Sequence, residues 1–240
     1  MRIGVFTLLW KRHEIASFVL NHYSNLELNG IELVLHAVGS EGKASRKIAE
    51  DAGWNYTEHP NQPFTDKWNC ATEFFKDKDV DACVMIGSND LVNDAYFYVL
   101  KDVLSDGIDS IRLGGLVMLE TKTGRSVYFG SDTCGREIMI GSGKAWNREI
   151  LEKVKYKLFV PGLHRSSDLA TETLTYPYQK RYVITGNPFN FGVCHIDIKS
   201  PTNLHSFDLI SESLKTVPFD IEEIKKYYKN GKEIIDFIKK

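Results

Sequence analysis

Val84-Met85-Ile86-Gly87-Ser88-Asn89-Asp90-Leu91 joins an apolar run to a polar turn. The run begins at Ala82, and a short apolar segment that ends at such a turn is typical of a fully buried strand. In an open α/β sheet, ligands collect at the carboxyl ends of the parallel strands. We therefore expect the turn at residues 87–90 to face a ligand-binding crevice.

Around this stretch, β-branched and apolar segments alternate with amphipathic segments through the first hundred residues. That alternation is typical of βαβ units and of a mainly parallel sheet. The expected strands are 2–8, 31–38, 53–56 and 82–86, and the expected helices are 14–25, 43–52 and 66–75. The sequence thus predicts an α/β fold in which helices flank a mostly parallel central sheet, and the carboxyl ends of the first, second and fourth strands should meet at one crevice.

The second half has a smaller antiparallel part. Residues 114–119 and 126–129 form a predicted hairpin around Thr123-Gly124. Further strands are expected at 182–185 and 191–198, and helices at 147–154 and 169–175. Residues 221–240 are rich in Lys and Glu at amphipathic spacing. We expect one domain over residues 1–220, with a C-terminal amphipathic helix over 221–240 packed on it.

Composition excludes several classes of protein. The chain has 240 residues, 42% of them hydrophobic and 26% charged, with a net charge of -2, which is ordinary for a globular domain and rules out a disordered chain or a coiled-coil rod. No apolar run approaches the ~18 residues that span a bilayer, so we expect a cytoplasmic protein without a membrane span. The four cysteines have no zinc spacing and are expected to be free thiols. The near-neutral charge gives no general electrostatic footprint for nucleic acid.

Familiar catalytic and cofactor motifs are missing. The sequence contains no GxGxxG after its first strand and no GxxxxGK[ST], so neither the dinucleotide nor the Walker phosphate cradle is present. It also lacks GxSxG and HExxH, which removes two common kinds of hydrolase. The chemistry must come from another arrangement.

Asp90 is the first candidate for such chemistry. A carboxylate and an amide at the end of a strand can hold a hard divalent cation, and the cation can neutralise a diphosphate leaving group. The alternative is structural, because an Asn-Asp pair at this point can also cap a helix over residues 90–100. Both interpretations are open from the residues alone.

Residues 2–210 resemble the GT-A glycosyltransferases, particularly the family 2-like enzymes that use nucleotide sugars and that include viral and phage members. Ser88-Asn89-Asp90 stands where that family carries its DxD motif, and Asp90 matches the metal-binding acid. Ser88 departs from the pattern by replacing the first Asp. The resemblance implies Mn²⁺ or Mg²⁺ as cofactor and a nucleotide-sugar donor of the UDP type.

The resemblance also implies a nucleotide site. Three segments would face the nucleotide: the end of the first strand with the residues after it, the turn that follows the second strand, and the helix beginning near residue 66. The Asp that usually contacts uracil in the family is absent from that turn, Val38-Gly39-Ser40-Glu41-Gly42. The residues implied are Thr7, Leu9, Arg12, Ser40, Lys67, Asn69, Ser88 and Asn89.

A glycine-rich segment resembles the family's donor–acceptor junction. Gly141, Ser142 and Gly143 would let the backbone approach a sugar closely, and Trp146 would offer a stacking face. A turn followed by a core tryptophan remains the alternative for Trp146. Asp168 stands where the family places its catalytic base, which would take the proton of the acceptor hydroxyl. The alternative is that Asp168 only favours the dipole of a helix that Ser166 or Ser167 caps.

Many GT-A enzymes complete the metal site with a C-terminal histidine. The candidates in this chain are His164, His195 and His205. We favour His205, because it follows the last strand on a polar loop that suits closure over a diphosphate, whereas His195 lies on an apolar strand and is better explained as a core residue.

The resemblance implies an inverting transfer of a sugar to a hydroxyl by direct displacement. The acceptor is a sugar or a modified DNA base of the kind that phage enzymes glycosylate. A DNA acceptor needs a basic groove, for which the sequence offers Lys11, Arg12, Lys144, Arg148, Lys153, Lys155, Lys157 and Arg165. Two further functions stay open, a sugar-nucleotide nucleotidyltransferase and a non-catalytic nucleotide- or sugar-binding module of the same fold. Nothing in the sequence specifies an oligomeric state.

Overall fold

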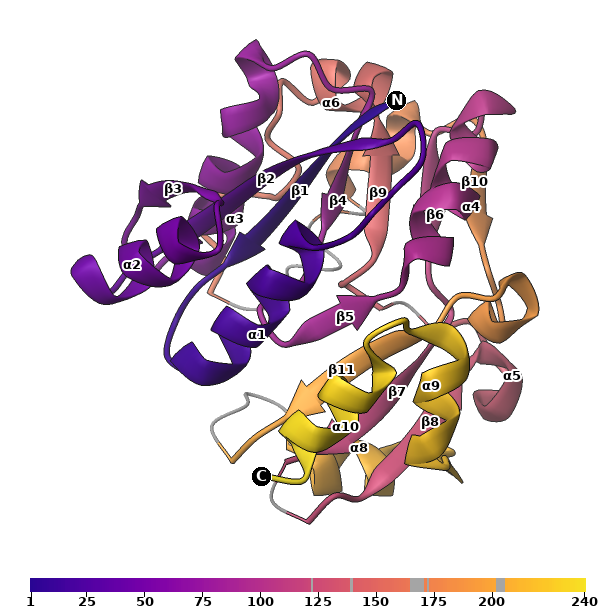
Figure 1. Cartoon of the computed structure of the whole chain (residues 1–240). Coiled ribbons are helices and arrows are strands. Elements are labelled where there is room, and N and C mark those ends of the chain that lie inside the picture. The colour runs from indigo at the N-terminus through magenta and orange to yellow at the C-terminus, as the bar shows by residue number, and fades with distance from the viewer. Residues whose placement is uncertain (122, 139, 165–170, 172, 202–205) are drawn as a thin grey trace.

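The apolar run Ala82–Met85 forms strand β4, the middle strand of the larger sheet (Figure 1). This computed structural model describes residues 1–121, 123–138, 140–164, 171, 173–201 and 206–240. Among the described residues the larger sheet has seven strands. In spatial order they are β10 (Tyr182–Ile184), β6 (Ser110–Arg112), β9 (Lys144–Asn147), β4, β1 (Arg2–Leu8), β2 (Glu32–Gly39) and β3 (Asn55–Glu58).

Most neighbours in this sheet run parallel, as the βαβ pattern predicts. β1 lies between β2 and β4 and is parallel to both, and its Phe6 pairs with His36 on one side and Met85 on the other. β9 is the exception because it runs antiparallel to β4 and β6. The carboxyl ends of β1, β2 and β4 therefore lie at one edge, where the crevice is expected.

Helices cover both faces of the larger sheet. Apolar side chains of α1 (His13–Ser24), α2 (Lys43–Asp51) and α4 (Asp94–Ser105) join the core on one face. Those of α3 (Phe64–Glu73) and α6 (Arg148–Lys153) pack on the other face, around a cluster that includes Phe6 and Trp146. The shorter helices include α5 (Ser131–Cys134), α8 (Phe207–Ser213) and the 3-10 helices η1 (Phe74–Asp77), η2 (Tyr176–Tyr178) and η3 (Pro188–Phe191).

A second sheet is built mainly from the later part of the chain. Its order is β12 (Val217–Pro218), β8 (Ser126–Gly130), β7 (Gly115–Glu120), β11 (His195–Lys199) and β5 (Asp90–Val92). The predicted hairpin is confirmed as β7 and β8, which pair antiparallel. Ile196 and Ile198 point into the core shared with the larger sheet, so the alternate residues of β11 face the other way.

The C-terminal helix predicted over residues 221–240 is broken. The segment forms η4 (Ile221–Glu223), α9 (Ile224–Tyr227) and α10 (Gly231–Ile238). The break lets the buried Tyr228 hydroxyl share its one proton between the carbonyls of Cys194 (2.7 Å) and Leu91 (3.0 Å), which ties the segment to β5 and to the residue before β11. The ring of Phe237, on α10, stacks on Phe18 of α1 at 4.2 Å.

Three further expectations need comment. β11 starts at His195 rather than 191, because the residues from Pro188 to Phe191 form a 3-10 turn that ends at Gly192 with a φ of 70°. Of the helix expected over 169–175, residues 171 and 173–175 are helical and the others lie outside the described residues. All four cysteines are free thiols, as predicted. Within the described part of the chain, every helix is too short or too polar to cross a bilayer.

Candidate functional site

The turn Gly87-Ser88-Asn89-Asp90 leads from β4 directly into β5. The backbone N–H of Asp90 donates to the carbonyl of Gly87 at 3.0 Å, and the hydroxyl of Tyr23 donates to the carbonyl of Asp90 at 3.1 Å. Asp90 is thus a strand residue, and α4 begins only at Asp94. The interpretation of Asp90 as a helix cap is wrong, because a β-strand separates it from the helix.

β11 places further polar side chains opposite Asp90. Asp197 pairs with Asp90 across the two antiparallel strands, and His195 Nε2 lies 3.7 Å from Asp90 Oδ1. His195 is 0% exposed, and neither ring nitrogen has a hydrogen-bond partner among the described residues. His195 is therefore not the satisfied core histidine that its apolar neighbours suggest. Its ring can accept a further ligand or proton donor.

Asn89 and Lys199 complete this cluster. The amide of Asn89 donates to Asp197 Oδ1 at 2.5 Å and to the carbonyl of Ile198 at 3.2 Å. Lys199 Nζ lies 2.5 Å from the other oxygen of Asp197. Burial raises the pKa of Asp197 against the attraction of Lys199, and the Asp90 carboxylate raises it further. The cluster is held by bonds within the chain, while the Asp90 carboxylate keeps free coordination capacity.

Arg12 approaches the same cluster from the first crossover. Its guanidinium donates to Ser88 Oγ at 3.3 Å. Burial lowers the pKa of Arg12, while Asp90 and Asp197 raise it again, so the cation is held by nearby carboxylates. The structure therefore brings Arg12, Ser88, Asn89 and Asp90 together, as the sequence predicts.

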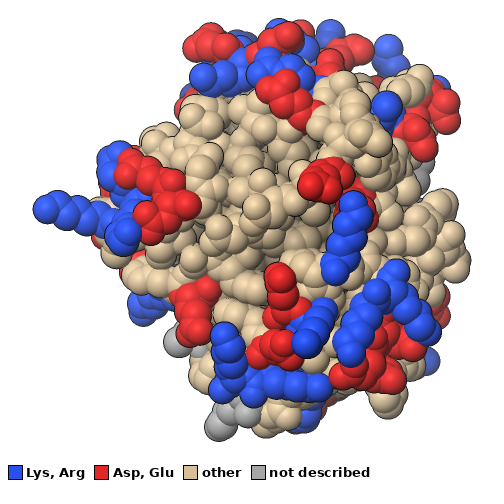
Figure 2. Space-filling model, viewed as in Figure 1, with Lys and Arg blue, Asp and Glu red and all other residues tan. Residues whose placement is uncertain are grey.

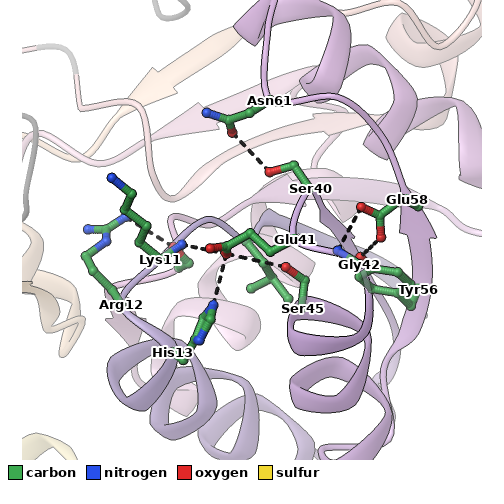
Figure 3. Close-up of polar contacts among 12 residues, drawn as sticks. Lys11, Arg12, His13, Ser40, Glu41, Gly42, Ser45, Tyr56, Glu58 and Asn61 are labelled. Carbon is green, nitrogen blue, oxygen red and sulfur yellow. Dashed lines mark hydrogen bonds and ion pairs between the residues drawn. The ribbon is translucent and has the colours of Figure 1, made fainter.

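The loop that carries Arg12 has an unusual backbone. Lys11 and Arg12 both adopt left-handed φ angles, 53° and 49°, which cost about 1–2 kcal/mol each in residues with a side chain. Glu41 stabilises this loop by accepting from the Lys11 backbone at 2.7 Å and from His13 at 2.9 Å (Figure 3). Partial burial works against ionisation of Glu41, but these hydrogen bonds outweigh it and lower the pKa. Strain that is over-determined in this way is common at functional sites.

Lys67 is buried beneath the loops that follow β1, β2 and β3. It is 0% exposed, and its ammonium donates to the carbonyl of Leu9 (2.7 Å), to Ser40 Oγ (3.0 Å) and to Asn61 Oδ1 (3.2 Å). An ammonium has three N–H donors, and all three are used. The nucleotide contact of Lys67 stays a prediction that this arrangement does not favour, because no N–H donor is left for a phosphate. Lys67 thereby holds together the loops that follow β1, β2 and β3. Figure 3 shows two of its acceptors, Ser40 and Asn61.

Four other predicted contact residues are also buried. The side-chain amide of Asn69 is occupied by the backbone of Phe159, donating at 2.8 Å and accepting at 2.9 Å. Leu9 and Trp146 are each 1% exposed and belong to the core, so Trp146 offers no stacking face. The Thr7 hydroxyl is sealed from solvent, without a partner among the described residues. These four residues support the fold and do not reach the surface of the crevice.

The glycine-rich segment lies beside the turn after β4. Ser142 Oγ accepts from the backbone of Gly87 at 3.1 Å, and the N–H of Gly143 donates to the carbonyl of Met85 at 2.8 Å. Gly143 has a φ of 78°, which favours glycine. Gly141 and Ser142 are partly exposed there, and their contact with a sugar stays a prediction.

Two predicted residues, Asp168 and His205, lie outside the described residues, so their roles also stay predictions. His164 is exposed, and its Nδ1 pairs with the side chain of Gln62, away from Asp90. The sequence reasoning missed Asp197 and Lys199. Their signal was the alternation His-Ile-Asp-Ile-Lys, which places a polar residue at every second position of a strand.

Three of the basic residues proposed for a DNA groove are buried or paired among the described residues. Lys144 is 0% exposed, Arg148 is paired with Asp79 and Glu152, and Lys157 is paired with Glu73. Arg165 lies outside the described residues. Figure 2 shows acidic and basic side chains intermixed around a mainly uncharged middle on the face in view.

Comparison with solved structures shows which known fold this chain shares. The structure of the first 349 residues of S. aureus TarS with UDP-GlcNAc matches with a TM-score of 0.60 at 13% identity, over 85% of this chain and 60% of that one. A second structure of the same TarS fragment gives 0.56 at 13% identity, over 80% of this chain and 62% of that one. A mycobacterial protein gives 0.53 at 14% identity, over 82% of this chain and 65% of that one. The chain has a GT-A-like fold. No family model and no curated protein matches the sequence.

Among described residues, the GT-A-like fold contains no ready-made group of three acidic, histidine or cysteine ligands. The donors that do fit a divalent cation are the Asp90 carboxylate, which is 8% exposed, and the imidazole of His195 beside it, which lacks a hydrogen-bond partner in the described chain. Carboxylate and imidazole both suit Mn²⁺, whereas Mg²⁺ favours the carboxylate and the oxygens of a bound phosphate. The donor set is therefore compatible with a cation that a diphosphate would help to hold.

Proposed function

We propose that this chain is a nucleotide-sugar-dependent glycosyltransferase with a UDP-type donor. The observation that supports this most is the position of Asp90 at the carboxyl end of β4, beside Arg12 and His195, in a fold shared with a protein solved in complex with UDP-GlcNAc. The chain spans about 60% of that TarS fragment, so donor class and reaction are inferred from the site. The reaction class accounts for a buried carboxylate beside a partly buried guanidinium at the edge of the sheet, in a sequence that has no other phosphate cradle.

In this proposal, Asp90 and His195 would hold Mn²⁺, or Asp90 and the diphosphate oxygens would hold Mg²⁺. When bound, the cation supplies charge neutralisation for the diphosphate leaving group. Arg12 contributes a second positive charge, held in place by Ser88 and by the strained loop that Glu41 stabilises. Because these groups are pre-positioned, they can stabilise charge in the transition state without reorganising.

The reaction proposed is a single inverting displacement. The acceptor hydroxyl attacks the anomeric carbon, its proton passes to the carboxylate of Asp168, and the bond from the anomeric carbon to the diphosphate breaks. The nucleoside diphosphate leaves with the bonding electrons. We propose a hydroxyl on a glycan or a small molecule rather than a DNA base, because Lys144 is buried and Arg148 and Lys157 are paired with carboxylates, which leaves fewer cations for a DNA backbone.

Thermal unfolding of the full chain tests the donor assignment. UDP, GDP, CMP, dTDP and ADP are each added at saturation with and without Mn²⁺. Binding at 100 times Kd stabilises by about 2.7 kcal/mol, or roughly 5–10 °C for a domain of this size. We expect that shift for UDP with Mn²⁺, and a much smaller shift for Asp90→Asn. Asp102→Asn, an exposed aspartate on α4, is the matched control and should behave as the wild type.

Turnover separates an enzyme from a binding module. Release of UDP from UDP-GlcNAc and related UDP-sugars, in the presence of candidate acceptors, should fall at least 100-fold in Asp90→Asn and remain unchanged in Asp102→Asn. No shift with any nucleotide, in a chain that unfolds cooperatively, would sink the donor assignment. Nucleotide binding without turnover on any sugar would favour the non-catalytic module.

A further inference from the structure

A cavity of about 450 Å³ lies away from the candidate active site. Its walls come from the second half of α1, the start of α4 and the broken C-terminal segment. The lining residues that decide its chemistry are His22, Glu27, Asp94, Tyr227, Lys229 and Glu233. The Asp90 carboxylate and Arg12 are not part of this lining, so the cavity is a separate feature.

Acidic side chains outnumber basic ones around the cavity. The lining carries Glu27, Asp94 and Glu233 against one lysine, Lys229, so the formal charge is three negative against one positive. Lys229 lies 3.6 Å from Asp94 and offsets that carboxylate. Glu27 and Glu233 make no hydrogen bond or ion pair within the described chain. Both are exposed, so two solvated carboxylates without a cationic partner in the described chain border the cavity.

His22 offers the cavity a second and independent acceptor. It is 7% exposed, and its Nε2 lies 2.9 Å from the carbonyl of Val92. Because a carbonyl can only accept, Nε2 carries the proton and Nδ1 presents a lone pair. Nδ1 has no partner among the described residues, and unlike the ring nitrogens of His195 it is not sealed from solvent. Burial lowers the pKa of His22, which keeps this tautomer neutral at pH 7.

Three aromatic side chains stand among the asparagines and the leucine that form the rest of the wall. Phe18, Tyr227 and Tyr228 line the cavity, and Phe18 is fixed by its stacking on Phe237. Aromatic rings attract an ammonium group through their quadrupole and do so more strongly when the contact is desolvated. The carboxylates, the imidazole lone pair and the rings all favour a ligand that is positively charged, donates N–H bonds and has an apolar stem.

We propose that this cavity binds an alkylammonium group, as carried by a free polyamine or by a lysine side chain. The ammonium lies between Glu27 and Glu233 and donates to His22 Nδ1, and the methylene chain packs on the aromatic walls. The site is independent of sugar transfer.

Isothermal titration calorimetry on the full chain tests the proposal with two probes, spermidine and Nα-acetyl-lysine methylamide. We expect at least one probe to bind, and the double variant Glu27→Gln/Glu233→Gln to weaken its binding at least 10-fold. The matched control is Glu149→Gln/Glu212→Gln, which removes two exposed carboxylates elsewhere that likewise lack partners in the described chain. Both double variants have the same net charge, so the control should bind as the wild type does.

Each outcome bears on the proposal. Binding of spermidine alone assigns a polyamine, binding of the lysine derivative assigns a lysine side chain, and binding of both assigns the shared ammonium group. An Nδ1 resonance of His22 that moves on binding, in ¹⁵N NMR, supports the predicted contact. Absence of binding by both probes at millimolar concentration overturns the proposal, as does an equal loss of affinity in the two double variants, which would indicate general charge attraction.

Discussion

The hydroxyl of Thr7 has no hydrogen-bond partner in the described chain, although β1 buries it completely. A buried polar group without a partner costs about 1–3 kcal/mol, because it has lost its water and gained nothing in exchange. The family resemblance implies that this side chain contacts the nucleotide, whereas its burial indicates that it belongs to the protein interior. The two interpretations predict opposite effects when the hydroxyl is removed.

We expect Thr7→Val to raise the free energy of unfolding by about 1 kcal/mol, since valine has the same shape without the hydroxyl. Urea unfolding measures this, and the UDP-dependent thermal shift should be unchanged. A Thr7→Val variant that loses UDP affinity would contradict the burial argument and return Thr7 to the nucleotide site.

Sequence reasoning located the polar turn correctly but misjudged which polar residues face outward. Ser88, Asn89 and Asp90 were predictable because they follow a strand whose end must face the crevice. The burial of Asn69 was not, because the backbone that occupies its amide, at Phe159, is 90 residues away. The burial of Lys67 was not predictable either, because two of its three acceptors, at Leu9 and Ser40, are 58 and 27 residues away. The sequence alone does not distinguish a buried lysine that donates to three acceptors within the protein from an exposed lysine that binds phosphate.

At the scale of the element, the connection from β4 to β5 leaves almost no room around Asp90. A methyl group on Gly87 would lie 2.0 Å from Asp90 Oδ2, closer than any real contact. The carboxylate is a flexible side-chain end and can swing away, so the fold should tolerate this substitution. We expect the Asp90 carboxylate, however, to be displaced from its present position.

We therefore expect Gly87→Ala to unfold within about 3 °C of the wild type, as a change below about 1 kcal/mol would give in a domain of this size. The additional stabilisation that Mn²⁺ gives in the presence of UDP should be largely lost. The measurement is the same thermal unfolding with UDP alone and with UDP plus Mn²⁺. An undiminished metal-dependent shift would mean that Asp90 does not hold the cation.

Element type was predictable where the hydrophobic period was long and failed where an element was short. β1, β2, β4 and α3 match their predictions within about three residues. β5 was taken as the start of a helix, because Asp90–Val92 is too short to show alternation and a helix follows at Asp94. The tail broke into α9 and α10 because Tyr228 is drawn inward to bind two carbonyls, which the charge pattern does not reveal.

Across the whole molecule, buried neutral histidines make stability depend on pH. His36 is 0% exposed, with its two ring nitrogens 3.0 Å from the Ala71 carbonyl and from Thr57 Oγ1. Burial lowers the pKa of His36 to about 4. Burial lowers the pKa of His22 as well. The unfolded chain, with the pKa of histidine near 6.5, takes up protons first as pH falls, so stability decreases between about pH 6.5 and 4.

His36→Gln tests this dependence, because glutamine can still donate and accept but does not titrate. Between pH 7 and 4.5 the wild type should lose about 2–3 kcal/mol more of its free energy of unfolding than the variant does. Urea unfolding at the two pH values gives both differences. Equal losses would show that His36 does not carry the acid sensitivity.

The GT-A-like architecture as a whole was the most predictable feature. Alternating segments over the first hundred residues indicate the parallel sheet, and Thr123-Gly124 marks the hairpin of the second sheet. The pairing of β5 with β11 was not predictable, since a three-residue strand contains too little information to choose a partner from the other end of the chain.

That pairing has a consequence for the order in which the chain is made. Asn89 and Asp197, which close the cluster around Asp90, are 108 residues apart. At roughly 5–20 residues per second, a ribosome needs on the order of 5–20 s to synthesise the chain between them. β1, β2, β3 and β4 can assemble in that interval, since all lie within the first 85 residues. The parallel strands of the larger sheet can therefore form before the candidate site is complete. Until β11 has been synthesised, the Asp90 carboxylate remains solvated and lacks its neighbours His195 and Asp197.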